Sequence, residues 1–98
     1  MDATSIKQHL RQIEAALVSP ATDAPTLGRV IATLEQHCEV IPGGEDTWKP
    51  RFWANWGALE EVYAVALDRG MSDLDAECQK IIEEGVRELR SIVASVLV

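Results

Sequence analysis

Aromatic residues are scarce in this chain, and they are confined to one region. The 98 residues include three tryptophans, one tyrosine and one phenylalanine. All but the tyrosine lie in segment 48–56, which reads WKPRFWANW and contains Trp48, Phe52, Trp53 and Trp56. A core that extends along the whole chain must therefore be built mainly from aliphatic side chains, and the aromatic segment needs its own explanation.

Cysteines and long apolar runs are also rare. The only cysteines, Cys38 and Cys78, fall on predicted apolar helix faces, as expected for reduced, buried thiols of an intracellular protein. The longest uncharged apolar run, residues 91–98, is far shorter than the roughly 20 residues that a membrane span requires. Residues 1–10 lack the basic and apolar regions of a signal peptide. We therefore expect a cytoplasmic protein with no membrane partner.

Basic residues are also few. The chain has 16 acidic residues against 9 basic ones, which gives a formal net charge of −7. Because non-specific nucleic-acid binding depends on Lys and Arg that neutralise phosphates, this balance argues against a direct nucleic-acid partner. It favours a partner that is itself basic, although many acidic proteins carry their charge for solubility alone.

Metal-binding motifs are absent. The chain contains no Cys-x-x-Cys, no His-x-x-x-His and no acidic calcium loop. One conceivable ligand set remains, made of His37, Cys38, Cys78 and either His9 or Glu35. The apolar stripe positions of both cysteines explain them without a metal, so we expect no metal and no cofactor.

Catalytic motifs are absent too. Segment 42–46 lacks the lysine and the strand-to-helix context of a phosphate-binding loop. Candidate nucleophiles such as Ser19 and Ser91 have no base at a recognisable spacing. The neighbouring carboxylates Glu60 and Glu61 point about 100° apart on a helix, so they do not share a proton. We therefore expect no catalytic residue.

Helical periodicity is what the sequence does contain. In four segments, apolar residues recur at alternating spacings of four and three, which places each set on one helix face. The segments cover residues 4–18, 25–40, 48–69 and 73–97, and connections rich in Pro and Gly separate the first three. Short connections without strand-like alternation predict an all-α fold, with residues 1–98 forming a single-domain antiparallel bundle of four helices.

The predicted core residues follow from these stripes. The first two helices present narrow stripes, Ile6, Leu10, Ile13 and Leu17, then Leu27, Ile31, Leu34 and Cys38. The third presents Phe52, Trp56, Leu59, Tyr63 and either Ala66 or Leu67. The fourth has two rows, Leu74, Cys78, Ile81, Gly85, Leu89, Ile92 and Val96 beside Ile82, Val86, Val93 and Leu97. This broad face predicts two neighbouring helices, and Gly85 predicts a close approach, with an indole of the third helix as the candidate.

Three helix ends carry recognisable capping residues. Asp23 is expected to cap the second helix, with Pro25 in its first turn, where a missing N–H costs nothing. Gly70 fits the position just after the third helix. In the fourth helix Ser72 is the predicted N-cap, with Asp75 three residues later in a variant of the capping box.

On a helical wheel the aromatic segment divides into two groups. Phe52 and Trp56 lie on the core face, whereas Trp53 lies on the flank and Trp48 at the helix start. A partly exposed tryptophan with a polar rim has the composition of a protein-interface hot spot. We predict that these two tryptophans anchor a partner, within a rim formed by Lys49, Arg51, Asn55 and Glu60.

Acidic side chains complete the predicted partner surface. They lie on the third helix and around the start of the fourth, at Glu60, Glu61, Asp68, Asp73, Asp75 and Glu77. Such a cluster would steer the chain toward a basic surface while a tryptophan anchors the contact.

In size, acidity and helicity the chain resembles bacterial immunity proteins, which block basic nuclease or other toxins, and phage-encoded inhibitors. The resemblance is one of composition, and no segment matches a family motif, so it assigns no functional residue. It implies an inhibitor or immunity-type protein-binding module that neutralises a basic partner, such as a toxin or nuclease, by occlusion.

Two alternatives stay open. One is an oligomeric structural or adaptor bundle, with homodimerisation through the fourth helix, whose last residues, 91–98, are apolar. The other is a small-ligand-binding protein or an enzyme, with its site between the third and fourth helices.

Overall fold

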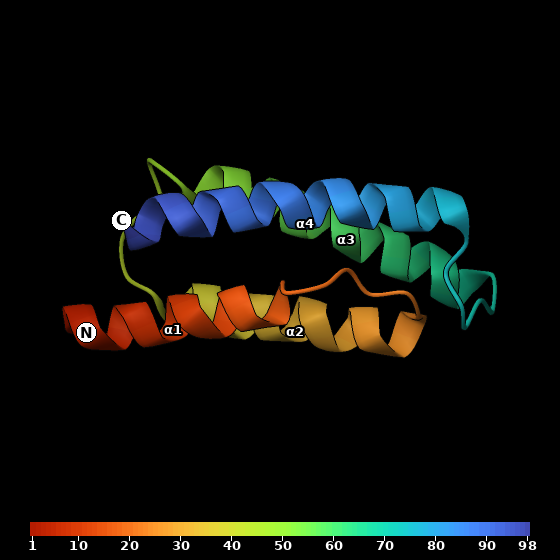
Figure 1. Cartoon of the computed structure of the whole chain (residues 1–98), viewed down its shortest axis with the longest axis horizontal. Coiled ribbons are helices and arrows are strands. Elements are labelled where there is room, and N and C mark those ends of the chain that lie inside the picture. The colour runs from red at the N-terminus through yellow and green to blue at the C-terminus, as the bar shows by residue number, and fades with distance from the viewer.

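The computed structural model describes all residues, 1–98, as four helices. These are α1 (Ala3–Ala16), α2 (Ala24–Val40), α3 (Lys49–Asp68) and α4 (Ala76–Leu97). The predicted all-α four-helix bundle is therefore confirmed. Consecutive helices run in opposite directions in a body whose Cα extents are 42 × 19 × 19 Å (Figure 1). None of the four helices combines the length and apolar character that crossing a membrane requires.

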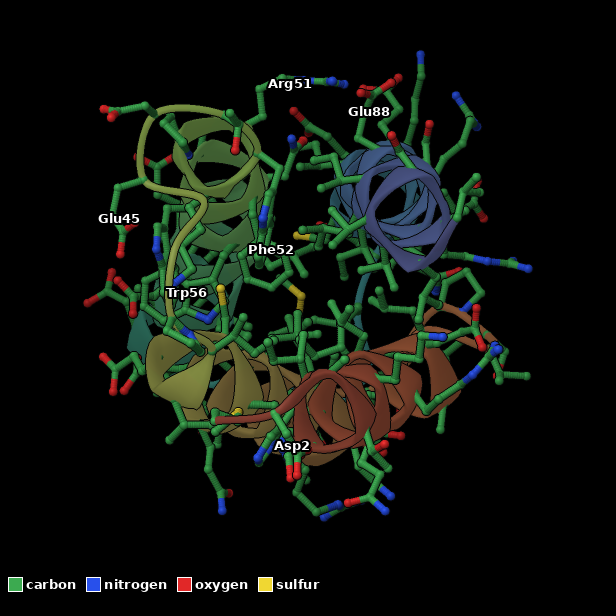
Figure 2. The ribbon with its side chains drawn as sticks, turned by 90° about the vertical axis from the view of Figure 1, so that its left-hand side faces the viewer. Asp2, Glu45, Arg51, Phe52, Trp56 and Glu88 are labelled. Atoms are coloured by element: carbon green, nitrogen blue, oxygen red, sulfur yellow. The ribbon has the colours of Figure 1, made fainter.

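The helices pack in a cycle around one core. Contacts join α1 with α2, α2 with α3, α3 with α4 and α4 with α1, whereas the backbones of the two diagonal pairs stay farther apart. In the end-on view of Figure 2 the four ribbons accordingly stand at the corners of a square, and Phe52 points between them. The seam between α1 and α2 thus lies opposite the seam between α3 and α4.

Aliphatic side chains fill this core, as the stripes predict. Leu10, Leu17, Leu27 and Leu34 are each at most 1% exposed. On α4 every predicted apolar position is buried or half-buried except Ile81, which is 39% exposed. Phe52 is the only aromatic side chain that is completely buried.

The buried face of α3 agrees with the prediction only in part. Phe52, Leu59 and Ala66 are buried as predicted, and Leu67, the alternative to Ala66, is 59% exposed. Val62, which the stripe omits, is also buried, whereas Trp56 and Tyr63 are only half-buried. The reason is that α3 contacts both α2 and α4, so its buried face points between these two neighbours rather than along the aromatic side chains.

Gly85 marks a close approach between α4 and α3, as predicted, but the neighbour is not an indole. A Cβ at this glycine would lie 3.2 Å from Cδ2 of Leu59 and 3.8 Å from the backbone oxygen of Asn55. Trp56, the tryptophan predicted on the core face, instead donates from Nε1 to the Ile31 oxygen at 3.0 Å. This hydrogen bond turns the indole toward α2, away from α4.

The start of α4 lies later than predicted. Ser72 is not its N-cap, because the helix begins at Ala76 and the Asp75 side chain accepts from the Cys78 N–H at 2.8 Å. A tertiary contact occupies the preceding residues: the Ala24 N–H donates to the Ser72 oxygen at 2.8 Å. Residues 72–74 therefore pair with the segment before α2 in an isolated antiparallel bridge and cannot start a helix.

The other two predicted caps are confirmed. The Asp23 carboxylate accepts from the Thr26 N–H at 2.8 Å at the start of α2. After α3, Gly70 has a φ of 63°, and the Met71 N–H donates to the Ala66 oxygen at 2.8 Å, which is the Schellman arrangement.

The α2–α3 connection closes the other end of the bundle. Gly43 and Gly44 have φ values of 80° and 84°, which L-residues with a side chain rarely adopt. The Trp48 indole lies directly on Gly44, where an added Cβ would fall 2.3 Å from Nε1. The same Cβ on Gly43 would meet nothing within 4 Å.

This difference gives a test of the Trp48 contact. Gly43→Ala should cost about 1–2 kcal/mol of unfolding free energy, because alanine is strained at a positive φ. Gly44→Ala carries the same strain and also a clash with the indole, so it should cost about 1–3 kcal/mol more. Urea unfolding followed by tryptophan fluorescence measures both. Equal losses in the two variants would show that Trp48 does not depend on Gly44.

Candidate functional site

The aromatic segment forms one continuous stack of edge-to-face contacts. Phe52 lies at its centre, with ring centroids 5.9 Å from Trp48 and 5.4 Å from Trp53. Trp53 in turn contacts Trp56 at 5.4 Å, with the rings perpendicular. Both flanking tryptophans, Trp48 and Trp53, are half-buried and pack against the core. Much of their surface is therefore used inside the chain.

The polar residues predicted around the tryptophans also have partners within the chain. Lys49 is only 7% exposed, and its ammonium group donates to the Ile41 oxygen and lies 3.8 Å from Glu45. Arg51 pairs with Glu88 at 3.0 Å across the α3–α4 seam, where both are labelled in Figure 2. These contacts fix the start of α3 against its neighbours and leave little of the predicted rim free.

Asn55 and Glu60 complete the account of that rim. Asn55 is half-buried, and its side-chain amide donates to the Arg51 backbone oxygen at 2.9 Å. Glu60 is exposed and makes no ion pair. Of the predicted rim, only this carboxylate is free for a partner.

The acidic residues lie far from most of the aromatic stack. All six predicted members are exposed: Glu60, Glu61, Asp68, Asp73, Asp75 and Glu77. Trp53 and Asp68 are separated by about 22 Å along the axis of α3, because an α-helix rises ~1.5 Å per residue. Asp73 and Asp75 lie beyond that same end of the helix. The predicted surface is thus divided, with the tryptophans at one end and most of the carboxylates at the other.

Part of the acidic set borders a groove between α3 and α4. This α3–α4 groove has a volume of ≈ 270 Å³ and is lined by Ala58, Glu61, Val62, Val65, Arg69, Asp75, Glu77, Cys78 and Ile81. Its floor is apolar, and Val65 and Ile81 are each 39% exposed. The structure therefore combines carboxylates with accessible aliphatic side chains in one place.

The three carboxylates of the groove outnumber its one cation. Glu61, Asp75 and Glu77 have no basic group within 4.0 Å, and Arg69 is the only cation in the lining. The Asp75 pKa is lowered, mainly by the hydrogen bond from the Cys78 N–H and further by Arg69. The rim is therefore negative at neutral pH.

The apolar floor of the groove is the feature that the wheel of α3 missed. Ala58, Val62 and Val65 follow the same spacing of four and three as the aromatic stripe, one position earlier in the chain. A search for a second stripe on this helix would have found them. Ile81 could not be found this way, because it occupies a regular core position of α4.

The cysteines are buried free thiols on separate helices. Burial raises the pKa of Cys38 to about 11, and burial also raises the pKa of Cys78. Neither is a reactive nucleophile, since the thiolate is disfavoured in both. No group of three or more His, Cys, Asp or Glu side chains is placed to hold a metal ion.

The two histidines, by contrast, meet across the α1–α2 seam. Nδ1 of His9 lies 2.8 Å from Nδ1 of His37, and the ring centroids are 5.1 Å apart. One ring must donate and the other accept in this hydrogen bond. Burial lowers the pKa of His37, and the neighbouring His9 lowers it further.

No protein-family model, curated protein sequence or solved structure matches this chain.

The histidine pair predicts a loss of stability on mild acidification. Because the folded-state pKa of His37 lies below its ordinary value of 6.5, the unfolded chain binds more protons as the pH falls past that value. The stabilisation is complete above about pH 6.5 and disappears as the pH falls through the lowered pKa. Urea midpoints measured at several pH values should show this decline in the wild type.

A His37→Gln variant serves as the control, because glutamine keeps a hydrogen-bonding side chain but does not titrate. Its urea midpoint should vary less with pH in the same range. The capping carboxylates of Asp23 and Asp75 do not interfere, because their lowered pKa values place their titration below 3.8. An equal decline in both proteins would contradict the assignment to His37.

Proposed function

We propose that this chain is a protein-binding module whose α3–α4 groove accepts an apolar side chain from a basic segment of its partner. The observation that carries the proposal is the pairing of exposed Val65 and Ile81 with three carboxylates that have no basic partner. An apolar residue flanked by Lys or Arg matches this surface in both hydrophobicity and charge.

The two parts of the groove contribute differently to binding. Burial of aliphatic surface stabilises a complex by roughly 25 cal/mol per Å² and is insensitive to salt. The carboxylates raise the association rate of a basic partner, and this contribution is screened over about 10 Å at 0.1 M salt. Affinity that weakens as salt is added is therefore the expected behaviour of this complex.

The size of the groove favours a protein partner over a small molecule. Small-molecule sites commonly enclose about 300–1,000 Å³ and bury most of the ligand. The ≈ 270 Å³ of this groove is smaller, and it lies open along the surface between two helices. Room for one or two side chains suits the anchor of a larger contact.

Inhibition by occlusion is the role we propose for such binding. A chain with a net charge of −7 is attracted to the basic surface of a nuclease or similar toxin, and binding there would cover it. The compositional resemblance to immunity proteins points the same way.

The adaptor alternative, with a dimer through α4, has less support. Its apolar residues Ile82, Val86, Leu89 and Val93 are at most 5% exposed within this chain. Most outward positions of the helix up to residue 90 are charged and exposed, at Lys80, Glu83, Glu84, Arg87, Glu88 and Arg90. A second copy would find no continuous apolar face there.

Charge reversal in the groove tests the proposal. The double variant Glu61→Lys/Glu77→Lys should lose a basic partner captured from the native host and identified by mass spectrometry. The matched control is Glu39→Lys/Glu84→Lys, which changes the net charge equally at exposed positions outside the groove. With the purified partner, the groove variant should bind at least roughly tenfold more weakly, about 1.4 kcal/mol, and the control should bind nearly as wild type.

A third variant tests the contribution of the apolar floor separately from that of the carboxylates. Ile81→Ser should weaken binding while leaving its salt dependence unchanged, because it removes aliphatic surface and no charge. If both groove variants kept wild-type affinity for every basic partner, the groove would not be the binding surface.

For Trp53 we predict a role in stability and none in partner binding. Because its indole is half-buried between Phe52 and Trp56, Trp53→Ala should lower the unfolding free energy by about 1–3 kcal/mol. At temperatures where the variant stays folded, it should bind the partner as the wild type does. Thermal unfolding followed by circular dichroism, together with the binding assay, separates these effects. A stable variant that no longer binds would restore Trp53 as the anchor.

A further inference from the structure

The histidine pair has an arrangement that the proposed function does not use. His9 and His37 are the only histidines of the chain, yet residues 28 positions apart in sequence meet at hydrogen-bond distance. Both rings are half-buried at the α1–α2 seam, so solvent and ions reach them. Neither Nε2 atom has a hydrogen-bond partner within the chain.

The shared proton between the two Nδ1 atoms is what a metal ion would replace. One Nδ1 carries the proton of this hydrogen bond and the other accepts it. Both Nδ1 atoms can supply a lone pair once the donor ring carries its proton on Nε2, the other tautomer of neutral imidazole. Burial lowers the pKa of His37, and His9 lowers it further, which favours the neutral His37 ring. Neutral imidazole is the form that binds metals.

We propose that His9 and His37 form a two-imidazole binding site for a divalent transition-metal ion, with Cu²⁺ and Ni²⁺ preferred. The remaining coordination positions would be filled by water, because no third His, Cys, Asp or Glu joins the cluster.

The number of protein ligands supports this preference. The hydrogen bond of 2.8 Å between the Nδ1 atoms shows that the two helices bring both rings within reach of one ion. Tetragonal sites with nitrogen ligands are those that Cu²⁺ and Ni²⁺ favour, while Zn²⁺ favours a tetrahedron of three or four protein ligands.

A metal ion bound by His9 and His37 would link α1 to α2. The rings must turn so that both lone pairs point to a common ion, but the helices already stand at the required separation. An ion held by both side chains binds only the folded chain and raises its melting temperature. This face lies opposite the α3–α4 groove, so metal binding and partner binding can succeed or fail independently.

The test uses the full chain and Cu²⁺ alone. Isothermal titration at about pH 7.5, where imidazole is neutral, should show one Cu²⁺ per chain, and the melting temperature should rise. His9→Gln and His37→Gln should each weaken this binding at least tenfold. The control Glu35→Gln removes a metal-capable carboxylate from α2 outside the pair and should bind as the wild type does.

Pulsed electron paramagnetic resonance of the wild-type complex needs no variant and counts the coordinated imidazoles directly. Two equatorial imidazoles are expected, and their signal should disappear when the pH is lowered to about 5, where protons compete for both rings. One imidazole or none in that spectrum, or unchanged Cu²⁺ binding in both histidine variants, would overturn the proposal.

Discussion

Burial of aliphatic side chains between four helices is the interaction on which the rest of this structure depends. A chain of this length buries only about 60–65% of its unfolded surface, so a single core must use nearly all the apolar residues available. On α4 this demand takes up both apolar rows except Ile81 and leaves an outer face that is mostly charged. Among the few aliphatic side chains that remain accessible, Val65 and Ile81 are notable because they lie together with carboxylates in one groove, although others such as Leu67 are more exposed.

The two ends of the bundle are closed by different means, and this difference explains the aromatic segment. At one end the connections before α2 and α4 pair through backbone hydrogen bonds. At the other end, Trp48 covers a glycine turn and the buried Lys49 ammonium bonds to a backbone oxygen. A buried ammonium is costly without such a partner, so Lys49 and the loop stabilise each other. The tryptophans beside it close the start of α3.

The polar groups that could bind a partner or an ion lie on separate surfaces. Carboxylates lie around the α3–α4 groove, while the two imidazoles meet at the opposite seam. Neighbouring elements of the cycle place these groups on faces that do not overlap, so each can act without disturbing the other. The aromatic stack lies at one end of the bundle. Its role is structural, because Trp56 bonds α3 to α2 while the neighbouring Arg51 pairs with Glu88 of α4.

The spacing of apolar residues along the sequence alone determined the helices, their approximate limits and most of the core. The reason is that the helical repeat places residues three and four positions apart on the same face. Asp23 and Gly70 were predictable for the same reason, since caps act within a few residues. Tertiary structure decided what depends on distant segments. Ser72 lost its capping role to a bridge with the segment before α2, and α3 turned its buried face between two neighbours. The burial of Lys49, the division of the tryptophans from the carboxylates and the meeting of His9 with His37 all required the positions of other helices, which no local period contains.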